Sequence, residues 1–257
     1  MTSQTDQMAS SIGTWFELLS RVIAAILSLS ALGYFVGWRE ANSYYTALGA
    51  VWATASVPPL ALLQLSASTI VTLAAATFFS LILLLDHKLS PQNLSRLCLA
   101  CIVIGVILLV VSQGLQGYVP PSSAHILATV GSQLFAISAG LTLSELIGHI
   151  RLSSQPISST HLWLIYWFVI CGLFWAPDRL GEARALRDAE HLSSPLPIVE
   201  LDASLQPSDW RLVQLVGDKA ILMMLAEEAQ NRRFRIIEVN EVKTFGSTLK
   251  PTTSQEK

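Results

Sequence analysis

Long apolar runs alternate with short polar breaks over the first two-thirds of the chain. The runs cover about residues 22–38, 59–85, 97–119, 125–147 and 161–176. A helix needs about 20 largely apolar residues to cross a bilayer, and lipid offers no hydrogen-bond partner to an exposed backbone, which favours helices. The runs also lack the residue-by-residue alternation of a membrane β-barrel. The pattern predicts a membrane all-α bundle of about five transmembrane helices within residues 22–177.

The segments beside the first run have a mixed character. Residues 1–21 predict a helical lead-in along the membrane interface, without the short apolar core and cleavage site of a secretory signal. Residues 39–58 form a longer, semi-polar connection in which a short interfacial or re-entrant helix is expected. The proline pairs Pro58-Pro59 and Pro120-Pro121 disfavour helix continuation and mark the ends of runs.

A different pattern begins at residue 178. Residues 181–192 have the spacing of a charged helix. Farther on, two β-prone runs flank Gly217-Asp218, which indicates a hairpin with a two-residue turn. A helix over residues 219–229 is the rival interpretation, because Ala, Leu, Met and Glu favour helices.

The tail is therefore expected to be a separate unit. Residues 178–246 predict a small α+β C-terminal soluble domain with an antiparallel sheet. Residues 247–257 are polar, and a disordered tail is expected there.

Charge supports this division of the chain. Of 16 Lys and Arg and 18 Asp and Glu residues, only ten lie before residue 178. A charged side chain at the centre of a bilayer costs ~2.5–3.5 kcal/mol on insertion scales, so the lipid bilayer is the expected partner of this region. The net charge of −2 leaves no basic footprint for a nucleic acid.

The fourth run carries a stripe of small residues at every fourth position. The stripe consists of Ala128, Ser132, Ala136, Gly140, Ser144 and Gly148. Small residues at this spacing let helices approach closely in lipid. The stripe predicts a tight helix contact, either within the chain or at the seam of a homo-oligomer.

Two ionisable residues near the end of the fourth run are candidates for function. Glu145 is the acidic residue that lies well inside a predicted span, and His149 follows one turn later on the same face. An ionisable group inside a membrane is a functional candidate by default. The alternative is an interfacial pair that reaches water along its side chains.

A second group of candidates lies where the first run ends. Its members are Arg39, Glu40, Asn42, Tyr44 and Tyr45. This is the densest polar cluster at a predicted membrane boundary. It could bind a headgroup, an ion or a small ligand, or it could be an anchoring rim with aromatic residues.

Motifs of common enzyme classes are absent from the sequence, including those of P-loop, zinc-protease, serine-hydrolase and dinucleotide-binding enzymes. No catalytic, cofactor-binding or metal-ligating residue is therefore assigned. We expect a non-enzymatic multi-pass membrane protein, a sensor, scaffold or complex subunit whose C-terminal domain binds a protein partner. An oligomeric channel or small transporter is one alternative, and an intramembrane enzyme acting on lipid is another.

Orientation follows from the basic residues of the short loops. With the N-terminus inside, the inner ends and loops hold Arg21, Lys88, Arg96 and Arg151, and the outer loops hold only Arg39. Five spans then place the C-terminal domain outside, although three arginines soon after the fifth run oppose this. A bacterial inner membrane is the expected location, because the chain is compact and lacks eukaryotic tails or retention signals.

Overall fold

The computed structural model describes most of the chain. The described residues are 2–86, 88, 90–115, 118–152, 159, 163, 166–167, 171–190, 193–201, 210–226 and 231–246. The helices are α1 (Thr2–Leu48), η1 (Val51–Ser56), α2 (Pro59–Leu85), α3 (Pro91–Gly114), α4 (Pro121–Leu152), η2 (Cys171–Trp175), α6 (Ala176–Asp188) and η4 (Val239–Glu241). The strands are β1 (Ile198–Leu201), β2 (Trp210–Val216), β3 (Lys219–Met224), β4 (Arg233–Glu238) and β5 (Val242–Gly246).

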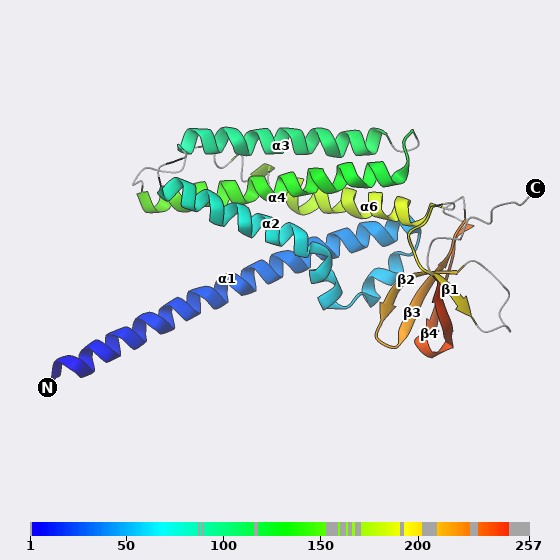
Figure 1. Cartoon of the computed structure of the whole chain (residues 1–257), viewed down its shortest axis with the longest axis horizontal. Coiled ribbons are helices and arrows are strands. Elements are labelled where there is room, and N and C mark those ends of the chain that lie inside the picture. Colours follow the sequence, from blue (N-terminus) through cyan, green and yellow to red (C-terminus); the bar gives the residue numbers. More distant parts are fainter. Residues whose placement is uncertain are drawn as a thin grey trace, which may run out of the picture.

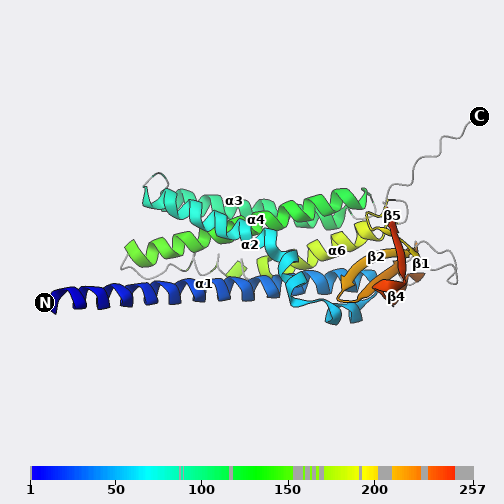
Figure 2. The same ribbon diagram turned by 60° about the horizontal axis from the view of Figure 1, so that its bottom comes forward.

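The long helices lie side by side, and the sheet lies at one end of them (Figures 1 and 2). The N-terminus lies at the opposite end, so that α1 runs the full length of the molecule. α4 is the central helix, since 56% of its most apolar window is buried, against 11% for that of α1. The helices start where the sequence disfavours continuation: proline is the first residue of α2, α3 and α4, and the Ser90 hydroxyl caps α3 by accepting from the Asn93 backbone amide at 3.3 Å.

Among the described residues, four helices are long and apolar enough to cross a membrane, which confirms the helical bundle and indicates a membrane location. They correspond to the first four predicted spans. Of the fifth predicted span, residues 161–176, the structure describes residues 163, 166–167 and 171–176, which are helical and include η2. The predicted tail, residues 247–257, lies outside them entirely.

α1 differs from the prediction at both ends. The sequence divides this region into a lead-in, a span over residues 22–38 and a loop, whereas the structure has one helix of 47 residues, about 70 Å long. No proline interrupts the segment before Gly49, whose φ of 87° ends the helix. The polar cluster that begins at Arg39 therefore continues the first helix instead of forming a loop.

The domain boundary expected at residue 178 falls inside α6. The sequence assigns this charged helix to a soluble domain, but α6 packs between α1 and α4 (Figure 1). Its charges are compatible with this position because partners on α1 and on α6 itself face them, as described below.

Close helix crossings depend on glycines. A Cβ at Gly37 would lie 1.9 Å from the Leu62 carbonyl oxygen of α2, and one at Gly140 would lie 2.6 Å from the Leu73 carbonyl oxygen. On α6, a Cβ at Gly181 would lie 2.2 Å from the carbonyl oxygen of Glu40. Backbones in such contact leave no room for a side chain, so these glycines set the spacing of α1, α2, α4 and α6.

The C-terminal sheet is antiparallel, as predicted, and its strand order is β4-β3-β2-β1-β5. Gly217, with φ of 61°, and Asp218 form the predicted two-residue turn between β2 and β3. β3 is a strand, so the rival helical interpretation of residues 219–229 is wrong for Lys219–Met224.

The sheet curls toward a small barrel. A flat five-stranded sheet would hold its edge strands about 19 Å apart, yet only η4 connects the edge strands β4 and β5. The four steps from Glu238 to Val242 span at most about 14 Å. Register shifts after Leu212 in β2 and after Glu200 in β1 supply the bends.

The two faces of the sheet bury different apolar residues. One face packs Val199, Ala220, Leu222 and Ile237 inside the curl. The other face places Ile221 and Met223 in a core with residues of α1, η1, α2 and α6. The sheet and the helical bundle therefore share one hydrophobic core, and the sheet is held against the bundle.

The α1–α6 crossing can be tested with matched glycine substitutions. We expect Gly181→Ala to destabilise the protein by about 1–3 kcal/mol, because the added methyl group would overlap the α1 backbone. Gly114→Ala is the control, since a Cβ there meets nothing within 4 Å. Thermal unfolding in detergent, followed by tryptophan fluorescence, measures both variants. Equal melting temperatures for the two would contradict the close crossing.

Candidate functional site

α6 is a charged helix that is enclosed by other elements. Each of its residues, from Ala176 to Asp188, is buried or half-buried. Burying a charge is costly unless it is paired and hydrogen-bonded. The ion pairs of α6 are therefore a condition for its place between α1 and α4.

At the start of α6, Asp178 is held by α1. The Arg39 guanidinium donates a hydrogen bond to the Asp178 carboxylate and lies over the Phe174 ring, 5.3 Å from its centroid. The Ser43 hydroxyl donates to the backbone carbonyl of Asp178 at 2.6 Å. These contacts join α1 to α6 about one turn before the Gly181 crossing.

At the end of α6, Asp188 accepts several hydrogen bonds while only 2% of its surface is exposed. Arg187 donates to Asp188 Oδ1 from Nε at 3.0 Å and from Nη2 at 2.8 Å. The Tyr44 hydroxyl donates to Asp188 Oδ2 at 3.1 Å. Tyr44 thereby connects α1 to the last turn of α6 through a buried carboxylate.

Arg184 lies between two carboxylates without approaching either closely. Its Nη1 is 3.7 Å from Glu40 Oε1, and its Nε is 3.8 Å from Asp188 Oδ2. Its guanidinium carbon also lies over the Tyr44 ring, 5.3 Å from the centroid. The contacts are electrostatic and cation–π in character, and both distances exceed that of a hydrogen bond.

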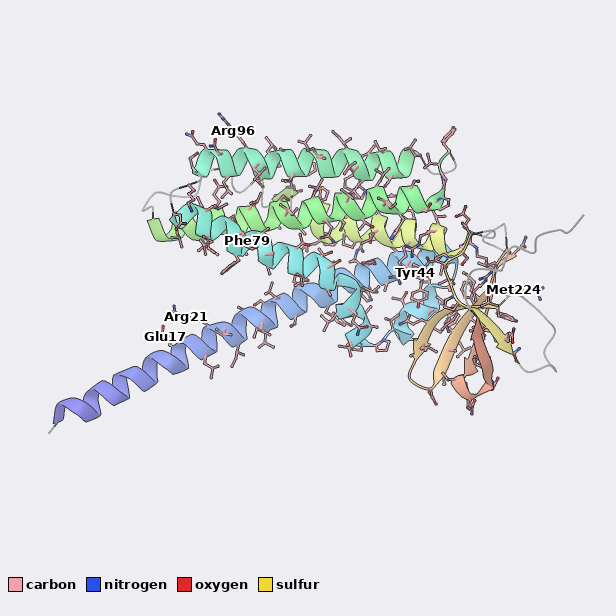
Figure 3. All side chains as sticks on the ribbon, in the orientation of Figure 1. Glu17, Arg21, Tyr44, Phe79, Arg96 and Met224 are labelled. Carbon is pink, nitrogen blue, oxygen red and sulfur yellow. The ribbon has the colours of Figure 1, made fainter. Side chains whose placement is uncertain are left out.

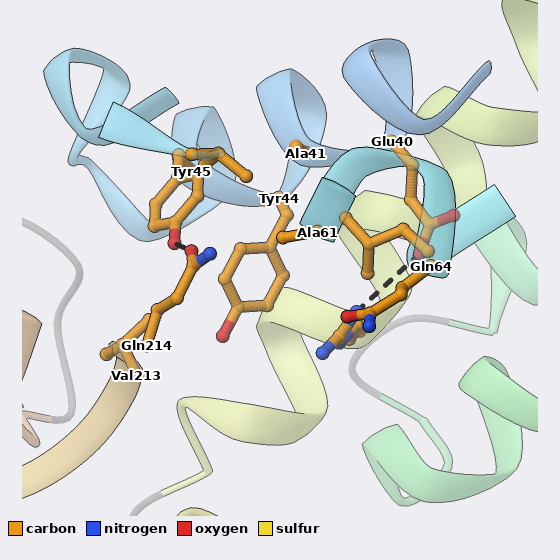
Figure 4. A pocket seen from close by; sticks show the side chains of 11 residues that line it. Glu40, Ala41, Tyr44, Tyr45, Ala61, Gln64, Val213 and Gln214 are labelled. Atoms are coloured by element: carbon orange, nitrogen blue, oxygen red, sulfur yellow. Dashed lines mark hydrogen bonds and ion pairs between the residues drawn. The ribbon is translucent and has the colours of Figure 1, made fainter. Parts of the chain in front are cut away.

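These residues border a cavity of about 270 Å³ where the bundle meets the sheet. Its polar lining consists of Glu40, Tyr44, Tyr45, Gln64, Arg184 and Gln214, from α1, α2, α6 and β2. Its apolar lining consists of Ala41, Val57, Ala61, Leu65 and Val213. Figure 4 shows the Tyr44 ring between Glu40 and Gln64 on one side and the Tyr45–Gln214 hydrogen bond on the other. A concave site with few convergent polar groups is suited to a small ligand.

Burial shifts the pKa of two charged groups that lie outside the long apolar helices. Burial raises the pKa of Asp178 above its ordinary value, and Arg39 offsets part of the increase. Burial lowers the pKa of Arg232, whose Nη1 donates to the Ala47 carbonyl at 3.4 Å near the end of α1. A cation at a helix C-terminus interacts favourably with the helix dipole, so Arg232 ties the sheet to α1.

The structure brings together most of the cluster predicted at residues 39–45. Glu40, Tyr44 and Tyr45 line the cavity, and Arg39 joins the adjacent ion pair with Asp178. Asn42 is half-buried, and its carbonyl accepts from the Thr46 hydroxyl at 2.6 Å. The cluster is therefore part of a packed junction between helices.

The other predicted pair is not at this site. Glu145 is buried in α4, with 7% of its surface exposed, and it does not line the cavity. His149 follows in α4, and its side chain lies outside the described part of the structure. Within the described residues, no group of three His, Cys, Asp or Glu side chains is arranged to hold a metal ion.

The small-residue stripe of α4 contacts helices of the same chain. Gly140 touches α2, and the Ser80 hydroxyl of α2 donates to Ser144 Oγ at 2.6 Å. Ser132 and Ala136 border a narrow gap that Leu32 and Val36 of α1 also line. Of the two roles predicted for the stripe, these contacts are of the intrachain kind.

Sequence reasoning did not identify the partners of the cluster. Asp178, Arg184 and Asp188 lie at least 130 positions after the end of α1, and Gln64 and Gln214 come from two further elements. The visible signal was a charged helix that directly follows an apolar, aromatic run. Charges placed there need partners if the helix stays in the bundle, and the cluster at the end of the first run supplies them.

Comparison with protein-family models, with curated proteins and with solved structures gives no match for this chain.

The Asp178 carboxyl gives a testable pH dependence. Because its pKa is raised in the folded state, its contribution to stability is greatest below its unfolded pKa, near pH 4, and is lost as the pH rises through the folded pKa. We expect Asp178→Asn to remove this decline in stability above about pH 4, since an amide does not ionise.

Thermal unfolding in detergent between about pH 4 and pH 7 measures how steeply the stability falls as the pH rises. Asp86→Asn is the matched control, because Asp86 is an exposed carboxylate at the end of α2. If stability fell with pH as steeply in Asp178→Asn as in the unsubstituted protein, the role of burial at Asp178 would be contradicted.

Proposed function

We propose that this chain is a non-enzymatic multi-pass membrane protein, a sensor or complex subunit whose C-terminal sheet binds a partner. The shared core between sheet and bundle carries this proposal. Ile221 and Met223 of β3 pack in one cluster with Tyr44 and Tyr45 of α1 and Ala185 of α6. A partner bound to the sheet would therefore act on the same contacts that hold α1 against α6.

The apolar surface of the helices supports a place in a membrane. Large apolar side chains along α1, α2 and α3 are exposed, among them Leu27, Phe79 and Ile107. Water would oppose such an exposed surface, whereas lipid accommodates it. A bacterial inner membrane remains our proposal for its location.

The positions of the charges support an orientation. Arg21 and Arg96 lie at the end of the bundle away from the sheet, and Met224 of the sheet lies at the other end (Figure 3). Basic residues in short loops favour the cytoplasmic side. We therefore propose that the N-terminal end faces the cytoplasm and that the sheet lies outside.

A channel or small transporter is less well supported. The small-residue stripe, which could have formed a seam between copies, is used for contacts with α1 and α2 of the same chain. The cavity also has walls from both the bundle and the sheet, which suits ligand binding at a junction better than passage through a bundle.

Reporter fusions test the orientation in bacterial cells. A reporter that is active only outside the cytoplasm is expected to give signal when joined after Gly246 and none when joined before Thr2. A fusion within the loop at Lys88 serves as the cytoplasmic control. The absence of signal from the C-terminal fusion, at an expression level equal to that of the other fusions, would contradict the proposed orientation.

The tie between sheet and bundle can be tested at Arg232. We expect Arg232→Gln to speed hydrogen exchange at the last amides of α1 about fivefold, because a hydrogen bond worth ~1 kcal/mol is lost at the Ala47 carbonyl. Arg233→Gln is the matched control, since Arg233 is exposed and its substitution also removes one positive charge. Hydrogen exchange followed by mass spectrometry measures both variants, and equal rates would show that Arg232 does not hold the end of α1.

A further inference from the structure

The cavity presents one negative and one positive group side by side. Glu40 and Arg184 both line it, with 3.7 Å between Glu40 Oε1 and Arg184 Nη1. This distance is longer than a hydrogen bond. The two groups attract each other electrostatically, but they do not form a hydrogen bond with each other.

Of the two groups, Glu40 is the more deeply buried and has the greater need of hydrogen-bond donors. Only 5% of its surface is exposed, and a buried carboxylate is costly unless donors reach its oxygens. Among the described residues, its charged contact is the long one to Arg184, and no hydrogen bond joins its side chain to another of them. The carboxylate therefore has accepting capacity toward the cavity.

Arg184 has donating capacity in the same place. Its distances to Glu40 and Asp188 are both beyond hydrogen-bond length, and Asp188 is already occupied by Arg187 and Tyr44. Stacking on Tyr44 fixes the plane of the guanidinium. A planar guanidinium with free donors is suited to a carboxylate or phosphate.

The remaining lining limits the size of a ligand. A cavity of about 270 Å³ is at the small end for a binding site. Gln64 is exposed and lies at the rim, and the side-chain oxygen of Gln214 is taken by the Tyr45 hydroxyl, which leaves the Gln214 amide group. The far wall is apolar, with Val57 and Leu65.

We propose that this cavity binds a small zwitterionic group, with its ammonium on Glu40 and its anionic oxygen on Arg184. In this arrangement the charges of Glu40, the ammonium, the anionic oxygen and Arg184 form a ring in which positive and negative alternate. Each charge then lies between two charges of opposite sign. An ammonium and a carboxylate oxygen on one carbon are about 3 Å apart, close to the 3.7 Å between the protein groups. The binding site deepens the proposed sensor function and rests on it for its biological meaning.

Two sources could supply this chemistry. A free α-amino acid carries both charges, and so does the headgroup of an amino-containing phospholipid. Gln64 is the sixth residue of α2, so the rim of the cavity lies near the start of an apolar helix, where either source has access. The shared chemistry is an ammonium and an anionic oxygen separated by a few bonds.

The experiment uses the full chain in nanodiscs of phosphatidylglycerol, which has no ammonium. Isothermal titration calorimetry measures binding of alanine and glutamine, and of two single-charge analogues, N-acetylalanine and alaninamide. A second arm adds phosphatidylethanolamine to the nanodiscs and measures the melting temperature. Each variant is first shown to be monodisperse with a cooperative melting transition.

We expect Glu40→Gln and Arg184→Gln to weaken binding of the zwitterion at least about tenfold, because each removes a charge-assisted hydrogen bond. Glu182→Gln and Arg179→Gln are the matched controls, since these residues pair with each other at 2.6 Å on α6 and do not line the cavity. Gln64→Trp, at an exposed position on the rim, is expected to block access without disturbing the ion pairs.

The outcomes separate the possibilities. Binding of free amino acids that depends on Glu40 and Arg184 supports the soluble source, and stabilisation by phosphatidylethanolamine with the same dependence supports the lipid source. Binding of either single-charge analogue as tightly as alanine overturns the proposal, as does the absence of any response in both arms. The reporter fusions are independent of this result, so a failure here leaves the proposed orientation standing, and the converse also holds.

Discussion

The pairing of buried and half-buried charges between α1 and α6 is the interaction on which the rest of the structure depends. α6 carries Asp178, Arg184 and Asp188 into a bundle of apolar helices, where unpaired charges would be expelled. Arg39, Glu40 and Tyr44 of α1 meet them. Because residues 189–197 alone connect α6 to β1 along the chain, the same pairing also helps to hold the sheet against the end of the bundle.

Close backbone contact makes this pairing possible. At Gly181 the α6 backbone touches the backbone of Glu40, so side chains one turn away on either helix are within reach of each other. A wider crossing would leave the carboxylates and guanidiniums too far apart to compensate for their burial. Glycine and charge thus act together: the small residue sets the distance, and the ion pairs favour the helix orientation that uses it.

The sequence predicted the individual helices and the hairpin better than the contacts that hold them together. The apolar runs predicted the helices from α2 to α4, and Gly217-Asp218 predicted the hairpin, because periodicity and turn chemistry are local. The extent of α1 and the position of α6 depend on partners far away in the chain. Arg39 could be recognised as a boundary residue, but its pairing with Asp178, 139 positions later, is a property of the fold. Likewise, the cluster at residues 39–45 indicated a site, whereas its opposite wall at Gln214 could not be deduced.

The location of the cavity has a consequence for how a ligand could act. A ligand shifts a conformational equilibrium only if it binds one arrangement better than another. The cavity takes walls from α1, α2, α6 and β2, so any movement of the sheet relative to the bundle would change its shape. Gln214 makes the link direct, since it belongs to the sheet and accepts from Tyr45 of α1. A ligand held by Glu40 and Arg184 would therefore favour the joined arrangement, and a partner that pulled the sheet away would release it.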